Sequence, residues 1–162
     1  MTILVTYSEN KEIRIISQFI ADRIHSDCIE IKDLNKKSGF FNNIISDYKA
    51  LRSSFTTIEP NSIDFSEYNL ILLGSPSILG KPSPAILTLI NNCDFKNKDV
   101  IIYTTTRSSK GTSVLKELKK KIESKGGKIL NSCIFRVNEK TEEELIMNTL
   151  KVIYELDLDL YV

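Results

Sequence analysis

Two kinds of segment alternate along the chain. Five short runs are apolar or alternate between apolar and polar residues, as strands do; they cover residues 2–7, 28–34, 69–74, 99–106 and 128–137. Five other segments repeat apolar residues at helical spacing; they cover residues 12–24, 39–55, 85–93, 113–125 and 145–156. Because each strand is followed by a helix, the pattern predicts an α/β fold, with a parallel sheet covered by helices on both faces.

Local signals mark the ends of some of these helices. Gly126 follows the fourth helix and predicts its end. Thr141, with Glu144 three residues later, predicts a capping box at the start of the last helix. Residues 56–68 show neither period and are interpreted as a long connection between the second helix and the third strand.

Composition limits the class of protein. The chain has 162 residues, which fits a single domain spanning 1–162. Its net charge of +1 does not indicate a general binder of nucleic acid. No apolar run approaches the roughly 20 residues that a transmembrane helix needs. The N-terminus has no basic region before its apolar run, so we expect no signal peptide and a cytoplasmic protein.

The cysteines and the single histidine exclude some chemistry. Cys28, Cys93 and Cys133 form no C-x-x-C pair, and their odd number favours reduced, buried thiols over a disulfide framework. With one histidine and no paired cysteines, we expect no zinc site. His25 ends the first predicted helix, at the edge of the sheet away from the ligand loops, so it does not complete a catalytic triad.

Parallel α/β sheets bind ligands beyond the carboxyl ends of their strands. The motifs G-x-G-x-x-G and G-x-x-x-x-G-K-[ST] are both absent, which argues against a dinucleotide fold and a P-loop. The first strand ends in "TYS" and the third in "LLGS", without the acidic residues of a phosphoacceptor receiver domain. The candidate ligand loops are therefore residues 8–12, 74–82 and 104–111.

Nearly the whole chain resembles the flavodoxin family. The stretches "ILVTYS", "IISQFIA", "FKNKDVIIYTTT" and "LKELKKKIESKGGKIL" resemble segments of that family. The most specific stretch is "DFSEYNLILLGSPSILGKPSPAI", in which five small or rigid residues stand where the family has them: Gly74, Pro76, Gly80, Pro82 and Pro84. The resemblance implies a flavodoxin-like three-layer sandwich, with a five-stranded parallel sheet in the order 2-1-3-4-5.

The resemblance also implies a cofactor, FMN, and a site for it on the three loops. The loop that would hold the phosphate contains Ser8, Glu9, Asn10, Lys11, Glu12 and Ile13. The loop that would flank one side of the flavin ring contains Ser75, Pro76, Ser77, Ile78, Leu79 and Gly80. The loop that would line its other edge contains Thr104, Thr105, Thr106, Arg107 and Ser108. No side chain is required as a nucleophile or general base.

The first two loops depart from the family pattern. Flavodoxins have roughly S/T-x-T-G-x-T in the first loop, and here only Ser8 keeps its hydroxyl. Glu9 and Glu12 place negative charge where a phosphate would bind. A carboxylate at a helix N-terminus is also favoured by the helix dipole without any ligand, so this segment could be an ordinary helix start. In the second loop, the family places an aromatic residue that stacks on the flavin ring. Near that position this chain has the aliphatic residues Ile78 and Leu79.

Two functions therefore stay open. The first is an FMN-binding redox protein, either an electron carrier or a flavin-dependent oxidoreductase, with a partner protein or NAD(P)H as its redox partner. The alternative is a flavodoxin-fold domain that has lost FMN and acts as an interaction module. The basic helix "KELKKKIESKGGK" differs from the acidic surface typical of carrier flavodoxins. An exposed "GFFNNII" segment would allow a homodimer.

Overall fold

The computed structural model describes residues 1–35 and 55–161. Outside residues 36–54, its strands and helices follow the predicted order, with one added strand, β3. In chain order they are β1 Thr2–Tyr7, α1 Lys11–Arg23, β2 Asp27–Asp33, β3 Ile58–Glu59, β4 Leu70–Pro76, α3 Pro84–Asn92, β5 Asp99–Thr106, α4 Gly111–Ser124, β6 Lys128–Arg136, α5 Glu142–Glu155 and a final 3₁₀ turn, Leu158–Tyr161. The helix predicted over 39–55 lies, apart from Phe55, outside the described residues.

The sheet confirms the predicted strand order and adds one strand. Its order is β3-β2-β1-β4-β5-β6, and all pairs from β2 to β6 are parallel. These five strands have the predicted order 2-1-3-4-5. The sixth, β3, pairs antiparallel with β2 through Lys32–Glu59 and Asp33–Ile58. The sequence interpretation of residues 56–68 as a plain connection missed it, because two residues are too few to show a strand period.

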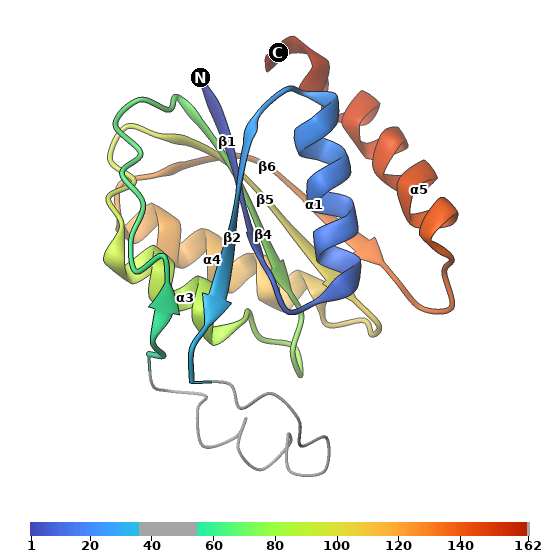
Figure 1. Cartoon of the computed structure of the whole chain (residues 1–162), viewed down its shortest axis with the longest axis horizontal. Coiled ribbons are helices and arrows are strands. Elements are labelled where there is room, and N and C mark those ends of the chain that lie inside the picture. Colours follow the sequence, from blue (N-terminus) through green and yellow to red (C-terminus); the bar gives the residue numbers. More distant parts are fainter. Residues whose placement is uncertain (36–54, 162) are drawn as a thin grey trace.

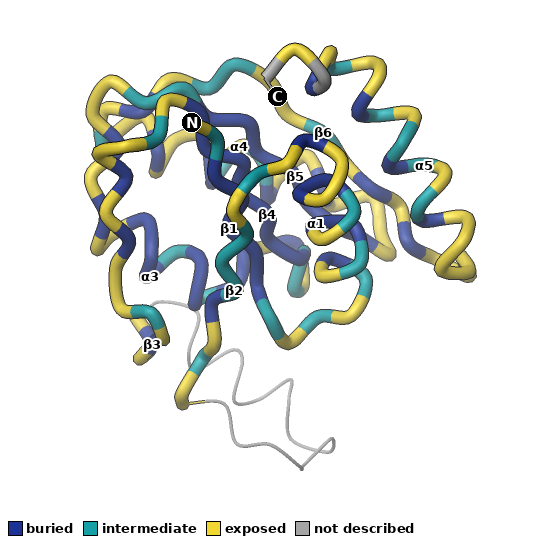
Figure 2. Tube along the Cα trace, turned by 45° about the horizontal axis from the view of Figure 1, so that its top comes forward, coloured by how far each residue is buried: buried dark blue, intermediate teal, exposed yellow. Residues whose placement is uncertain are grey.

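In the described part of the chain, two helices cover each face of the sheet. Figure 1 shows α1 and α5 on one face and α3 and α4 on the other. Buried residues are concentrated on the central strands and on the inward sides of the helices (Figure 2). Strands β4 and β5 are buried on both faces, apart from the first residue of β5, which explains their continuous apolar runs. The chain therefore forms the predicted three layers.

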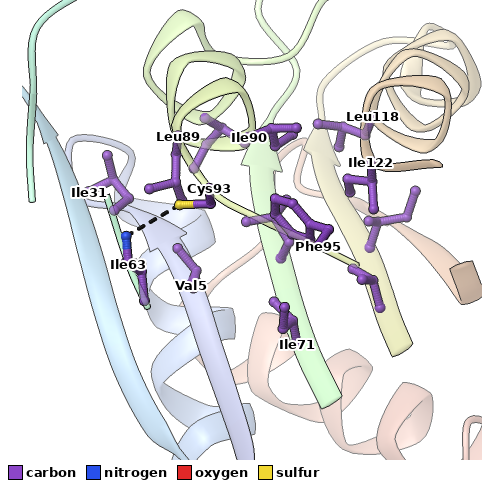
Figure 3. Packing of buried hydrophobic residues seen from close by; sticks show 14 of the residues in the cluster. Val5, Ile31, Ile63, Ile71, Leu89, Ile90, Cys93, Phe95, Leu118 and Ile122 are labelled. Carbon is purple, nitrogen blue, oxygen red and sulfur yellow. Dashed lines mark hydrogen bonds between the residues drawn. The ribbon is translucent and has the colours of Figure 1, made fainter. Parts of the chain in front are cut away.

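The core under α3 and α4 contains one cysteine. Figure 3 shows Leu89 and Ile90 of α3, together with Leu118 and Ile122 of α4, packed over the sheet. Among them the thiol of buried Cys93 accepts a hydrogen bond from the Ile63 N–H at 3.3 Å. Burial raises the pKa of the Cys93 thiol, so it stays neutral and packs as a small apolar group.

Helix ends follow the signals in the sequence. Thr141 and Glu144 form the predicted reciprocal capping box of α5. Gly126, with φ +85°, lies just beyond the end of α4 in the left-handed conformation that glycine favours. None of the helices in the described residues is long and apolar enough to span a bilayer.

The parallel strands place three loops at one edge. The C-terminal ends of β1, β4 and β5 lie at the lower edge of the sheet in Figure 1, where α1, α3 and α4 begin. The three predicted ligand loops leave the sheet there. His25 lies in the turn between α1 and β2, at the opposite edge, as expected.

Candidate functional site

All three predicted loops contribute to one pocket at this edge. Its volume is about 300 Å³, at the lower end of the range for small-molecule sites. Ten of the individually predicted site residues line it: Asn10, Glu12, Pro76, Ser77, Leu79, Gly80, Thr105, Thr106, Arg107 and Ser108. The remaining predicted residues do not line it: Ser8, Glu9, Lys11, Ile13, Ser75, Ile78 and Thr104.

Asn10 links the first loop to helix α1. It is the N-cap residue, and its Oδ1 accepts a hydrogen bond from the Ile13 N–H at 3.0 Å. The amide NH₂ of Asn10 is then the part of the side chain that can donate to a ligand. Ile13 itself is fully buried in the core, and the Ser8 N–H extends the sheet by bonding to the Ile31 carbonyl at 3.0 Å.

The two glutamates of this loop point in different directions. Glu9 accepts a hydrogen bond from the Tyr7 hydroxyl at 3.3 Å and does not line the pocket. Glu12 does line it, and its Oε1 accepts a hydrogen bond from Nη2 of Arg107 in the third loop. This ion pair joins the first and third loops. The negative charge of Glu12 is thereby paired within the pocket.

The second loop is a tight turn with a strained residue. Ile78 and Lys81 exchange two backbone hydrogen bonds of 2.9 and 3.0 Å, which enclose Leu79 and Gly80. Leu79 has φ +52° and Gly80 has φ +81°, the signs of a type I′ turn. Such a turn favours Asn-Gly, so leucine is strained there. Leu79 lines the pocket, and the residue is 47% exposed.

Helix α4 fixes the position of this turn. The Ser113 hydroxyl donates a hydrogen bond to the Gly80 carbonyl at 2.9 Å, and Lys81 pairs with Glu117 at 3.2 Å. A Cβ at Gly80 would lie 2.8 Å from Cδ of Lys110, so the Lys110 side chain lies directly against the turn. The apolar wall formed by Leu79 is therefore held in place from α4.

The third loop supplies polar groups and the start of a second helix. The Ser108 N–H donates to Thr106 Oγ1 at 3.1 Å, and the Ser108 hydroxyl accepts from the Lys110 N–H at 3.2 Å. Thr105 is buried, and its carbonyl accepts from the Ser77 N–H at 2.8 Å. Helices α1 and α4 both begin at the pocket, and helix N-termini favour anions.

A buried polar cluster lies under the first loop. Ser17 Oγ is 2.8 Å from Thr6 Oγ1 and 2.7 Å from the Tyr103 hydroxyl, which joins α1, β1 and β5. Complete burial raises the pKa of Tyr103, so its hydroxyl stays protonated. A Cβ at Gly74 would lie 2.5 Å from the Tyr103 ring. The glycine at this motif position therefore makes room for the tyrosine.

Two further residues line the pocket, one of them within the third candidate loop and the other outside all three loops. Lys110 is the N-cap residue of α4, and Val137 follows β6. Lys110 lies within the third candidate loop, where its positive charge indicated a possible partner for a phosphate. No motif in the sequence marked Val137 as a site residue. It reaches the pocket because β6 runs parallel to β5, so that the C-terminal end of β6 lies at the same edge of the sheet.

The lining groups favour a particular kind of ligand. Leu79 and Val137 offer apolar surface, while hydroxyls, an amide and two basic side chains offer hydrogen-bond donors. Glu12 is the one acidic residue among the lining residues of the described chain. The described residues contain no cluster of three potential metal ligands. This donor set fits a largely apolar molecule that carries an anionic group.

Comparisons with known proteins agree on the fold. The family model described as flavodoxin matches residues 21–146. A putative flavoprotein from Bacteroides uniformis is similar in structure, with a TM-score of 0.74, 19% identity, and coverage of 90% of this chain and 95% of that one. A flavoprotein from Lactobacillus acidophilus, in complex with FMN, has a TM-score of 0.65 and 24% identity, over 82% of this chain and 91% of that one.

A third solved structure extends the comparison to a flavodoxin. Oxidised flavodoxin 1 from Bacillus cereus has a TM-score of 0.56 and 15% identity, over 94% of this chain and 97% of that one. At these identities the structural likeness establishes the fold. No curated protein matches the chain.

Proposed function

Because this chain belongs to the flavodoxin family, we propose that its edge pocket binds FMN and that the protein acts in redox chemistry. The observation that carries the proposal is the convergence of the three predicted loops on one pocket. The FMN complex of the Lactobacillus acidophilus flavoprotein, which has the same fold, supports the choice of ligand.

The lining residues fit the two chemical parts of FMN. The Asn10 amide, the start of α1 and the cation of Arg107 would hold the phosphate. Leu79 and Val137 would cover the flavin ring by dispersion and exclude water from it, in place of an aromatic side chain. Thr105, Thr106 and Ser108 would line its polar edge.

The bound flavin would supply the transfer of electrons or hydride, while the protein positions it. The finer role is either an electron carrier or an oxidoreductase that uses NAD(P)H. We also propose that the protein acts in the cytoplasm, where Cys28, Cys93 and Cys133, all free in the structure, would stay reduced. We also propose that the protein can form a homodimer.

Titration of the apo-protein with FMN tests the proposal. Flavin fluorescence and the visible spectrum would be followed, first for the protein as isolated and then during the titration. We expect saturable binding with a dissociation constant in the micromolar range or tighter, on the order of −8 kcal/mol or better. Absence of binding at high micromolar FMN would contradict the proposal and favour the alternative, an interaction module.

A matched pair of variants shows whether binding uses this pocket. Leu79 and Tyr154 are both exposed apolar residues, but only Leu79 lines the pocket. Leu79→Asp should weaken FMN binding at least about tenfold, because a carboxylate would replace apolar cover and repel the phosphate. Tyr154→Asp, on α5, should change it less than about twofold. Equal effects of the two substitutions would place the ligand elsewhere.

A further inference from the structure

The Glu12–Arg107 ion pair lies where a ligand anion would bind. Glu12 is in the first turn of α1, where unpaired N–H groups and the helix dipole favour negative charge. Its side chain is turned to Arg107 across the first and third loops. The chain's own carboxylate thus pairs with the guanidinium, and it is carried by the first turn of α1, so it lies near both attractive elements of an anion site.

The pair is open to exchange with a ligand. The side chain of Arg107 is 68% exposed and that of Glu12 is 21% exposed. Ion pairs exposed to this degree contribute little to stability, because solvent screens them. A phosphate with up to two negative charges can form a bidentate contact with an arginine, which is stronger. A phosphate that binds Arg107 therefore competes with Glu12 for the guanidinium, and the charge of Glu12 stays beside the bound phosphate.

We propose that Glu12 is an internal competitor for the ligand phosphate and sets how far the pocket prefers FMN over riboflavin. This inference rests on the proposed function, since it concerns the same flavin pocket. The carboxylate lowers phosphate affinity in two ways, by holding Arg107 and by repelling the incoming anion. Riboflavin lacks the phosphate, so Glu12 leaves its affinity nearly unchanged.

The competition makes the effects of the two residues depend on each other. In the presence of Arg107, Glu12→Gln removes both the repulsion and the need to break the ion pair. In an Arg107→Gln protein, the same substitution removes the repulsion alone. The gain in FMN affinity from Glu12→Gln is therefore larger when Arg107 is present.

The experiment measures dissociation constants of FMN and riboflavin, at one ionic strength, for the wild-type protein, both single variants and the double variant. Glu12→Gln should tighten FMN binding about tenfold and riboflavin binding less than about twofold. In the Arg107→Gln background the FMN gain should fall to about threefold or less.

A control makes the same chemical change on strand β2, at a glutamate whose arginine partner lies on α1. Glu30 pairs with Arg14 of α1 at 3.3 Å, and neither residue lines the pocket. Glu30→Gln also removes a carboxylate from an arginine pair and changes net charge by the same amount. It should alter FMN binding less than about twofold. Thermal unfolding of each variant would show that it is folded.

The outcomes separate this inference from the proposed function. If FMN binds but Glu12→Gln leaves the FMN-to-riboflavin preference unchanged, the inference is overturned and the proposed function stands. An equal gain in the Arg107→Gln background would overturn competition for Arg107. If neither flavin binds the wild-type protein or Glu12→Gln, the proposed function fails, and the inference fails with it.

Discussion

Tyr103 leaves no room for a side chain at residue 74. A Cβ at residue 74 would lie only 2.5 Å from carbon atoms of the Tyr103 ring. The Tyr103 hydroxyl shares a hydrogen bond with Ser17 of α1, which holds the ring in place. The ring is fully buried and packs edge-on against Phe135, with centroids 6.1 Å apart. Gly74 is therefore retained by core packing, at a position where the motif alone would also allow a role in ligand binding.

Gly74→Ala should lower the free energy of unfolding by about 1–3 kcal/mol, since the buried ring must shift to accept a methyl group. Chemical denaturation measures this loss. Gly111→Ala is the matched control: its Cβ would approach the half-exposed side chain of Ile134 at 2.9 Å, which can move aside. It should cost less than about 1 kcal/mol. Equal losses in the two variants would contradict the packing argument.

Residue-level features explain which parts of the site were predictable. The sequence predicted a loop over residues 74–82, and the structure shows that this loop contains a tight turn at Leu79 and Gly80. Nothing in the sequence places Leu79 at φ +52°, because leucine seldom adopts that conformation. The pairing of Glu12 with Arg107 was also beyond the sequence, since it joins residues far apart in the chain. Charge type predicted their chemistry, but only the fold brings them together.

At the scale of secondary-structure elements, helix caps connect folding to the pocket. Asn10 caps α1 and lines the pocket, while Thr141 caps α5 and does not. Both side-chain oxygens accept a hydrogen bond from an N–H of the first turn, at 3.0 Å for Asn10 and 3.2 Å for Thr141. The two caps thus have the same structural role, and only one of them has a proposed functional role.

Asn10→Ala and Thr141→Ala should each lower the free energy of unfolding by about 1 kcal/mol, because each removes an N-cap. Only Asn10→Ala should also weaken FMN binding, by about threefold or more, through loss of the amide donor. Thermal unfolding and the FMN titration measure the two effects separately. If Thr141→Ala lost as much FMN affinity as Asn10→Ala, the loss would come from reduced stability, and the proposed contact between the Asn10 amide and FMN would be contradicted.

The elements themselves were predictable in proportion to their length and burial. Strands β4 and β5 show continuous apolar runs because helices cover both of their faces. Strand β3 has two residues and gave no signal, and the residue after it is Pro60, which favours neither period. Val137 was missed for a related reason, since it lines the pocket only because β6 runs parallel to β5.

At the scale of the whole molecule, two surfaces compete as the functional one. The first is the pocket at the C-terminal edge of the sheet. The second is the basic face of α4, where Lys116, Lys119, Lys120 and Lys121 are exposed. One of these lysines is already paired, since Lys119 lies 3.8 Å from Glu123 on the same helix. This pairing favours a solvated helix face and leaves the pocket as the stronger candidate.

The most direct test of the central claim is a map of amide chemical shifts in a ¹⁵N-labelled protein on addition of FMN. We expect the largest shifts at the three loops, in particular at the amides of Asn10, Ser77 and Arg107, with little change on α4 at Lys119 and Lys120. Shifts confined to the basic face of α4, or no shifts at saturating FMN, would contradict it.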